Sequence, residues 1–116
     1  MVINQIVFIL IEQIYGKPIN AKLDTDVVLC CPYLSTATHP IIWNGPITIG
    51  DYTHNERINK HIPIHDRLSL TGDNNTGEYN LKIHHLTRKD QGVYGCTTVL
   101  KGKTVSSEYT VIVLSK

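Results

Sequence analysis

Asp90-Gln91-Gly92-Val93-Tyr94-Gly95-Cys96 is the stretch of this sequence that decides the fold. Gly92 allows a tight turn, and the valine, tyrosine and threonine residues that follow it favour an extended strand. The stretch therefore predicts a loop that leads into a strand with a cysteine near its middle.

Similar strand-like segments recur along the whole chain. They are rich in Val, Ile, Tyr and Thr, they are separated by Gly, Pro, Asn and Asp, and helical periodicity is poor. Many short strands without helices between them predict an all-β antiparallel sandwich or barrel. The predicted strands lie near residues 5–14, 19–23, 26–33, 40–44, 47–52, 57–62, 67–71, 77–84, 92–100 and 103–114.

Length and composition predict one globular domain, covering residues 1–116. The chain is 41% hydrophobic and 18% charged, which indicates a packed core. Its formal net charge of +1 comes from scattered charges of both signs. We therefore expect neither nucleic-acid binding nor insertion of this segment into a membrane.

The amino terminus allows two interpretations. The apolar run Ile6–Ile11 is typical of a short signal peptide, but no Lys or Arg precedes it and polar residues flank it. Residues 1–11 are therefore either an extended first strand or the remnant of a leader. The run is too short to span a bilayer.

Cys31, Trp43, Arg67 and the Asp-x-Gly-x-Tyr-x-Cys run together resemble the variable set of the immunoglobulin superfamily. The resemblance extends from about residue 12 to residue 114, and it implies a two-sheet Greek-key sandwich. The two candidate strands between Trp43 and Arg67 supply the additional hairpin that marks the variable type. The segment 77–83 is also similar to variable-type domains of invertebrate surface and secreted proteins.

The resemblance assigns a role to each signature residue. Cys31 and Cys96 form a disulfide through the core, and Trp43 packs on it. Tyr94 is the corner tyrosine, placed by Gly92. Arg67 and Asp90 form a salt bridge that closes the bottom of the sandwich.

Strand alternation favours Cys31 over the adjacent Cys30 as the paired cysteine. If Cys31 faces inward, Val27 and Leu29 do so too; if Cys30 does, Asp26 enters the core, which is costly. Cys30 is then either a covered free thiol or an intermolecular cysteine.

No cofactor, metal site or catalytic activity is expected. The six histidines lack convergent ligand spacing, and His84 and His85 are neighbours on a predicted strand, so they point to opposite faces. Ser69, Ser106 and Ser107 lie in strand-like segments with no base partner evident in the sequence. An enzyme is therefore not expected.

Binding is predicted on the outer face of the sheet that carries Trp43 and Cys96. Alternation of side chains along each strand places several apolar residues on that face. The last strand adds either Val111 and Val113 or Ile112 and Leu114 to them. We expect a protein partner, namely another immunoglobulin-like domain or a second copy of this one, in innate immunity or cell adhesion. The alternative is a structural ectodomain module of a larger receptor with no ligand of its own. The predicted face comprises Ile42, Asn44, Gly95, Thr97 and Val99, with Val93 also facing outward.

An extracellular location, on a cell surface or secreted, is expected from the paired cysteines and from one glycosylation sequon. The sequon is Asn74-Asn75-Thr76, in a polar turn, with Asn74 as the acceptor.

Overall fold

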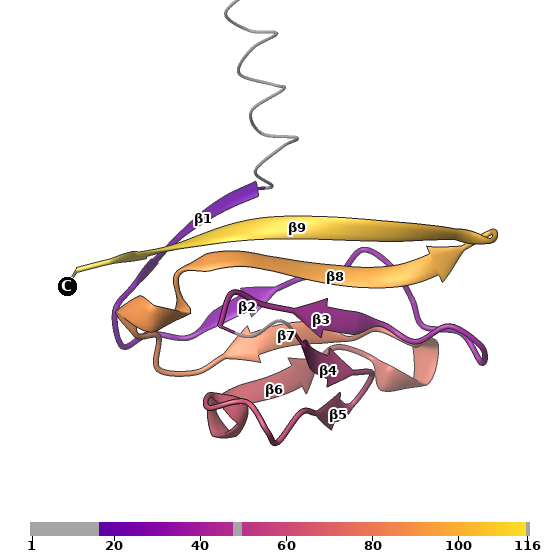
Figure 1. Cartoon of the computed structure of the whole chain (residues 1–116), viewed down its shortest axis with the longest axis horizontal. Helices are drawn as coiled ribbons and strands as arrows, with labels where there is room; N and C mark the ends of the chain where they lie inside the picture. The colour runs from indigo at the N-terminus through magenta and orange to yellow at the C-terminus, as the bar shows by residue number, and fades with distance from the viewer. Residues whose placement is uncertain (1–16, 48–49, 116) are drawn as a thin grey trace, which may run out of the picture.

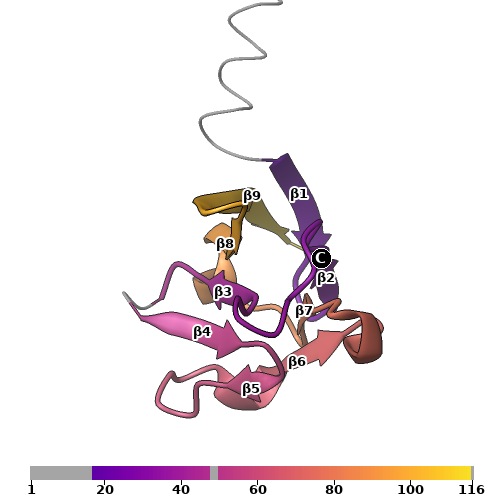
Figure 2. The same cartoon turned by 90° about the vertical axis from the view of Figure 1, so that its right-hand side faces the viewer.

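The computed structural model describes residues 17–47 and 50–115, which form two β-sheets packed face to face (Figures 1 and 2). The six-stranded sheet has the order β1-β9-β8-β3-β4-β5, and the three-stranded sheet has the order β2-β7-β6. All pairs are antiparallel except β1 with β9. The strands are β1 (Lys17–Lys22), β2 (Val27–Leu29), β3 (Ile42–Asn44), β4 (Asp51–His54), β5 (Arg57–Ile58), β6 (Leu68–Thr71), β7 (Asn80–Ile83), β8 (Gly92–Leu100) and β9 (Lys103–Leu114).

The only helices among the described residues are three single 3₁₀ turns: η1 (His65–Arg67), η2 (Asn74–Thr76) and η3 (Arg88–Asp90). The predicted all-β sandwich is therefore confirmed. The strand predicted near 5–14 and the two interpretations of residues 1–11 lie outside the described residues.

The core lies between the sheets and is built by alternation along each strand. Val27, Leu29 and Cys31 are buried, whereas Val28 and Cys30 between them are exposed. The same period of two buries Val111 and Val113 on β9 and leaves Leu114 exposed. The choice that the sequence left open on this strand is thus decided: Val111 and Val113 face inward.

Strand β2 is shorter than predicted because the backbone groups of Cys30 and Cys31 form hydrogen bonds with side chains instead of with a neighbouring strand. The Cys31 amide donates to Asn80 Oδ1 at 2.9 Å, and the Tyr109 hydroxyl donates to the Cys30 carbonyl. Pro32 then has no amide hydrogen to offer.

The additional hairpin β4–β5 is present, but both of its strands differ from the predicted bounds. Strand β4 begins at Asp51, which pairs with Asn44 of β3. The register between these two strands shifts between Trp43 and Asn44. Strand β5 ends at Ile58, because Asn59 turns the chain away: its side chain donates to the Asp51 carbonyl at 2.9 Å and accepts the His61 amide at 3.0 Å.

The hairpin β8–β9 has the predicted bounds, and its strands are the two longest among the described residues (Figure 1). Its two-residue turn is Lys101-Gly102, and both residues have positive φ, 50° and 76°. This is the backbone of a type I′ turn, whose twist matches that of the flanking strands.

Candidate binding face

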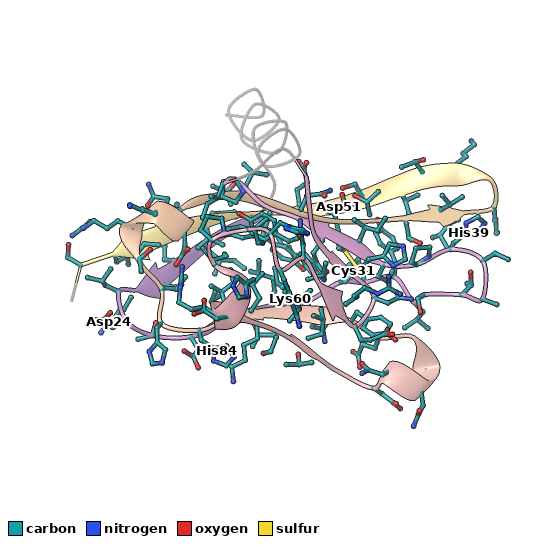
Figure 3. All side chains as sticks on the ribbon, turned by 60° about the horizontal axis from the view of Figure 1, so that its bottom comes forward. Asp24, Cys31, His39, Asp51, Lys60 and His84 are labelled. Carbon is teal, nitrogen blue, oxygen red and sulfur yellow. A yellow bond between two sulfur atoms is a disulfide. The ribbon has the colours of Figure 1, made fainter. Side chains whose placement is uncertain are left out.

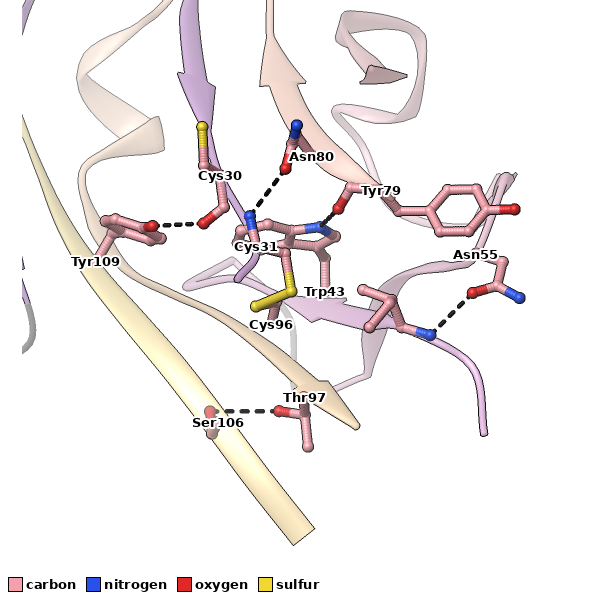
Figure 4. Close-up of a disulfide and its surroundings, with 11 residues drawn as sticks. Cys30, Cys31, Trp43, Asn55, Tyr79, Asn80, Cys96, Thr97, Ser106 and Tyr109 are labelled. Atoms are coloured by element: carbon pink, nitrogen blue, oxygen red, sulfur yellow. Dashed lines mark hydrogen bonds between the residues drawn. A yellow bond between two sulfur atoms is a disulfide. The ribbon is translucent and has the colours of Figure 1, made fainter. Parts of the chain in front are cut away.

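The disulfide between Cys31 and Cys96 joins the two sheets, as predicted (Figure 4). The Cα atoms of the two cysteines are 5.9 Å apart, within the usual range for a disulfide. Trp43 is fully buried beside the disulfide, and its indole nitrogen donates to the Tyr79 carbonyl at 2.9 Å. The bridge and the indole together hold β3 and β8 in a fixed position over the opposite sheet.

Tyr94 and Asp90 fix the start of β8. The Tyr94 hydroxyl donates to the Asp90 carbonyl at 2.6 Å, and burial raises the pKa of this phenol far above its usual value, so it remains a donor. The Asp90 carboxylate has no exposed surface and accepts both terminal nitrogens of Arg67 at 2.8 Å. The hydrogen bonds to the Asp90 carboxylate raise the pKa of the Arg67 guanidinium.

The outer sheet face is defined here as the side of the six-stranded sheet that points away from the three-stranded sheet. Cross-strand pairing brings the predicted residues together on it: Ile42 lies opposite Thr97, and Asn44 lies opposite Gly95. Ile42, Asn44, Thr97 and Val99 are all partly exposed. Val93 is 44% exposed and extends this apolar surface along β8.

Polar residues that the sequence analysis did not single out border this surface. His54 lies opposite Ile42 on one side. On the other side, Thr104, Ser106 and Glu108 of β9 lie opposite Val99, Thr97 and Gly95. These three residues alternate along the predicted strand 103–114, and this alternation could have identified them from the sequence. A surface that mixes apolar and polar residues in this way has the composition of many non-obligate protein interfaces.

Gly95 is the one residue of the predicted face that is not even partly exposed. It is buried, because the side chains of Ser106 and Glu108 lie next to it. A Cβ placed on it would lie 3.5 Å from Ser106 Oγ, which is ordinary van der Waals contact. The fold therefore does not require glycine at this position.

Replacement by alanine is expected to lower the stability of the domain at Gly92 but not at Gly95. Gly92 has φ of +146°, and a Cβ there would lie 2.5 Å from Pro46 Cβ. Gly92→Ala should therefore destabilise the domain by about 1–3 kcal/mol, whereas Gly95→Ala should leave stability within about 1 kcal/mol. Urea unfolding followed by tryptophan fluorescence measures both, and an equal loss in the two variants would contradict the assignment.

The remaining predicted positions lie away from the outer sheet face. Cys30 is exposed and has no disulfide partner in the chain. Asn74 is exposed at the start of η2. Within residues 17–47 and 50–115, no three His, Cys, Asp or Glu side chains gather in a way that could hold a metal ion. The same part of the chain has no helix with the length and apolar character needed to cross a membrane.

Two expectations about histidine and serine residues are wrong. His84 and His85 lie beyond the end of β7 rather than on a strand, and His85 has a positive φ of 51°. Ser69 does have a base partner, because its Oγ lies 3.0 Å from His84 Nε2. Sequence distance concealed this pair, which antiparallel pairing of β6 with β7 brings together.

Comparison with known proteins assigns the fold to a family. The model of the immunoglobulin V-set domain matches residues 15–114. No curated protein sequence matches the chain at a significant level.

Several solved structures have the same fold at low sequence identity. Dpr1 IG1, solved bound to DIP-eta IG1, is similar with a TM-score of 0.70 and 16% identity, covering 85% of this chain and 90% of that one. Tim-4, solved in complex with phosphatidylserine, has a TM-score of 0.69 and 22% identity, covering 86% of this chain and 100% of that one. Human T-cell immunoglobulin and mucin domain protein 1 has a TM-score of 0.66 and 19% identity, covering 86% and 99% of the two chains. With the family model matching most of its length, the chain belongs to the immunoglobulin V-set domain family.

Proposed function

We propose that this V-set domain is a protein-recognition module of a cell-surface or secreted protein. It binds another immunoglobulin-like domain, including a second copy of itself, through the outer sheet face. The observation that carries this proposal is that one side of the six-stranded sheet does not pack against the three-stranded sheet. The sheet buries one side in the core, while its other side exposes the apolar residues Ile42, Val93 and Val99 in part.

The composition of the outer sheet face suits association of two domains. Partly exposed apolar residues alternate with uncharged polar ones along β3 and β8, so a partner can approach these two strands while burying few charges. A second copy would meet the same residues across a two-fold axis, since isologous contacts pair one surface with itself.

The structural neighbours support a protein partner. Dpr1 IG1 was solved bound to DIP-eta IG1, and Dpr11 IG1 was solved bound to DIP-gamma IG+IG2. Tim-4 was solved with phosphatidylserine, so the fold by itself does not select the partner. The choice of a protein therefore depends on the flat, mixed surface of this chain.

Self-association is tested by sedimentation velocity over a range of concentrations up to high micromolar. The expected result is a reversible dimer, with Ile42→Asp and Val99→Asp each shifting the equilibrium to monomer by at least about tenfold, because a buried charge would lack a partner. Val28→Asp is the matched control, since Val28 is equally apolar and 44% exposed on the other sheet. It should leave the dimer intact.

Two results would contradict the proposal. A dimer weakened as much by Val28→Asp as by Ile42→Asp would show that the outer sheet face is not specific. A strict monomer at high micromolar concentration would exclude self-recognition. A screen against other immunoglobulin domains with the same variants would then decide whether this face binds any protein.

An extracellular location is supported by the disulfide and by the accessible sequon. The acceptor Asn74 and the hydroxyl residue Thr76 are both exposed in η2. Secretion of the domain from eukaryotic cells should therefore add an N-glycan at Asn74. Asn74→Gln should remove the mass that a peptide N-glycosidase releases from the wild type, whereas Asn75→Gln, which keeps the sequon, should retain it. Secretion of the wild type without a glycan would contradict this prediction.

A further inference from the structure

A serine, a histidine and an aspartate lie in line on the outside of the three-stranded sheet, away from the outer sheet face (Figure 3 labels His84). Ser69 Oγ is 3.0 Å from His84 Nε2, and His84 Nδ1 is 3.3 Å from Asp26 Oδ2. Ser69 belongs to β6, His84 follows β7, and Asp26 precedes β2. Neighbouring strands therefore bring together three residues that are far apart in the sequence.

Asp26 is held so that it orients the imidazole. Its second oxygen, Oδ1, accepts the backbone amide of His85 at 3.0 Å. This bond, followed by the charges of His84 and Lys82, lowers the pKa of Asp26 below its usual value, which keeps the carboxylate ionised.

The carboxylate favours one tautomer of His84. A proton on Nδ1 faces the negative oxygen, whereas a lone pair on Nδ1 would be repelled by it. With the proton on Nδ1, the lone pair of Nε2 points to Ser69, whose hydroxyl donates to it. A nucleophile bonded to a base that a third group orients is the arrangement that activates serine in acyl transfer.

We propose that Ser69 is a nucleophilic hydroxyl that accepts an acyl group from an activated ester. Ser69 Oγ attacks the ester carbonyl carbon while its proton passes to His84 Nε2. The bond to the leaving alcohol then breaks, and His84 returns the proton to that alcohol. Water, activated in the same way, hydrolyses the acyl-serine to a carboxylic acid and restores Ser69.

We expect Lys82 to supply the positive charge for the carbonyl oxygen on which negative charge develops. It is the cross-strand partner of Ser69, and its ammonium lies 3.9 Å from Asp26 Oδ2. The side chains of Lys82, His84 and Asp26 are all partly exposed, so a small ester reaches Ser69 without a cavity. The same exposure weakens the electrostatic help from Lys82, and we expect slow acylation.

The test uses p-nitrophenyl acetate with the domain carrying Cys30→Ser, because the exposed thiol of Cys30 would itself react. We expect acetyl transfer to Ser69, located by peptide mass mapping, with p-nitrophenol released about tenfold or more faster than by Ser69→Ala. Ser106→Ala is the matched control: Ser106 lies on a strand and is exposed, but its hydroxyl is bonded to the Thr97 hydroxyl rather than to a histidine. It should react like its parent.

The roles of His84 and Asp26 have their own readouts. His84→Ala should lose the acceleration, and added imidazole should restore part of the acetylation of Ser69. That acetylation is measured by mass mapping with His84→Ala/Ser69→Ala as the blank, because imidazole alone also cleaves p-nitrophenyl acetate. Asp26→Asn should slow acetylation about tenfold, and Asp26→Glu should restore part of the rate. Acetylation confined to lysines and other histidines, or a Ser69 rate unchanged by His84→Ala, would overturn the proposal. Neither result would affect the association measured for the outer sheet face.

Discussion

Asp90→Ala is expected to lower the free energy of unfolding by about 3 kcal/mol, because it leaves a partly buried guanidinium without its carboxylate. The Asp90 side chain is 0% exposed and accepts two nitrogens of Arg67 and the backbone amide of Thr87, each at 2.8 Å. Removing one partner of a buried ion pair costs about 3–5 kcal/mol. We expect the lower end, since Arg67 is 22% exposed and keeps its bonds to the carbonyls of His84 and His85.

Chemical denaturation at neutral pH measures this loss, and Asp66→Ala is its matched control. Asp66 is an exposed aspartate in η1, directly before Arg67. Its replacement should change the unfolding midpoint much less than Asp90→Ala does. Equal effects of the two variants would mean that the buried pair does not stabilise the bottom of the sandwich.

Loss of the disulfide is the second large effect that we expect. The bond closes a loop between positions 65 residues apart, which corresponds to about 4 kcal/mol in the chain-entropy model. A domain of this size has a total stability of roughly 5–15 kcal/mol. The double variant Cys31→Ala/Cys96→Ala should therefore be largely unfolded at 37 °C by circular dichroism, whereas Cys30→Ser should unfold near the wild-type temperature. A double variant that remains folded with an unchanged midpoint would contradict the role of the bridge.

Much of the fold could be predicted because its signals are local. Alternation at residues 27, 29 and 31 identified the inward cysteine, and the two-residue turn at Lys101-Gly102 fixed the bounds of the β8–β9 hairpin. The bounds of β2 and β5 could not be predicted in this way. They depend on side-chain bonds from Asn80 and Asn59, which connect to backbone groups only after the chain has folded.

The candidate site shows the same division. Period-two alternation identified the residues of the outer sheet face, since it needs only the direction of one inward residue per strand. The burial of Gly95 and the contact of Ser69 with His84 depend on the register between strands, which alternation does not determine. Register follows from turns and bulges acting together, so contacts of this kind required the structure.

The most direct test of this account is mass mapping of the non-reduced protein after alkylation of free thiols. The inward direction of Cys96 decides which side of β8 faces the core, and pairing of β8 with β3 then decides which residues form the outer sheet face. We expect fragment ions that place the alkyl group on Cys30 and the disulfide between Cys31 and Cys96. An alkylated Cys96 would remove the basis for the sheet face on which the recognition role depends, and a disulfide between Cys30 and Cys96 would contradict the direction of the segment that follows β2.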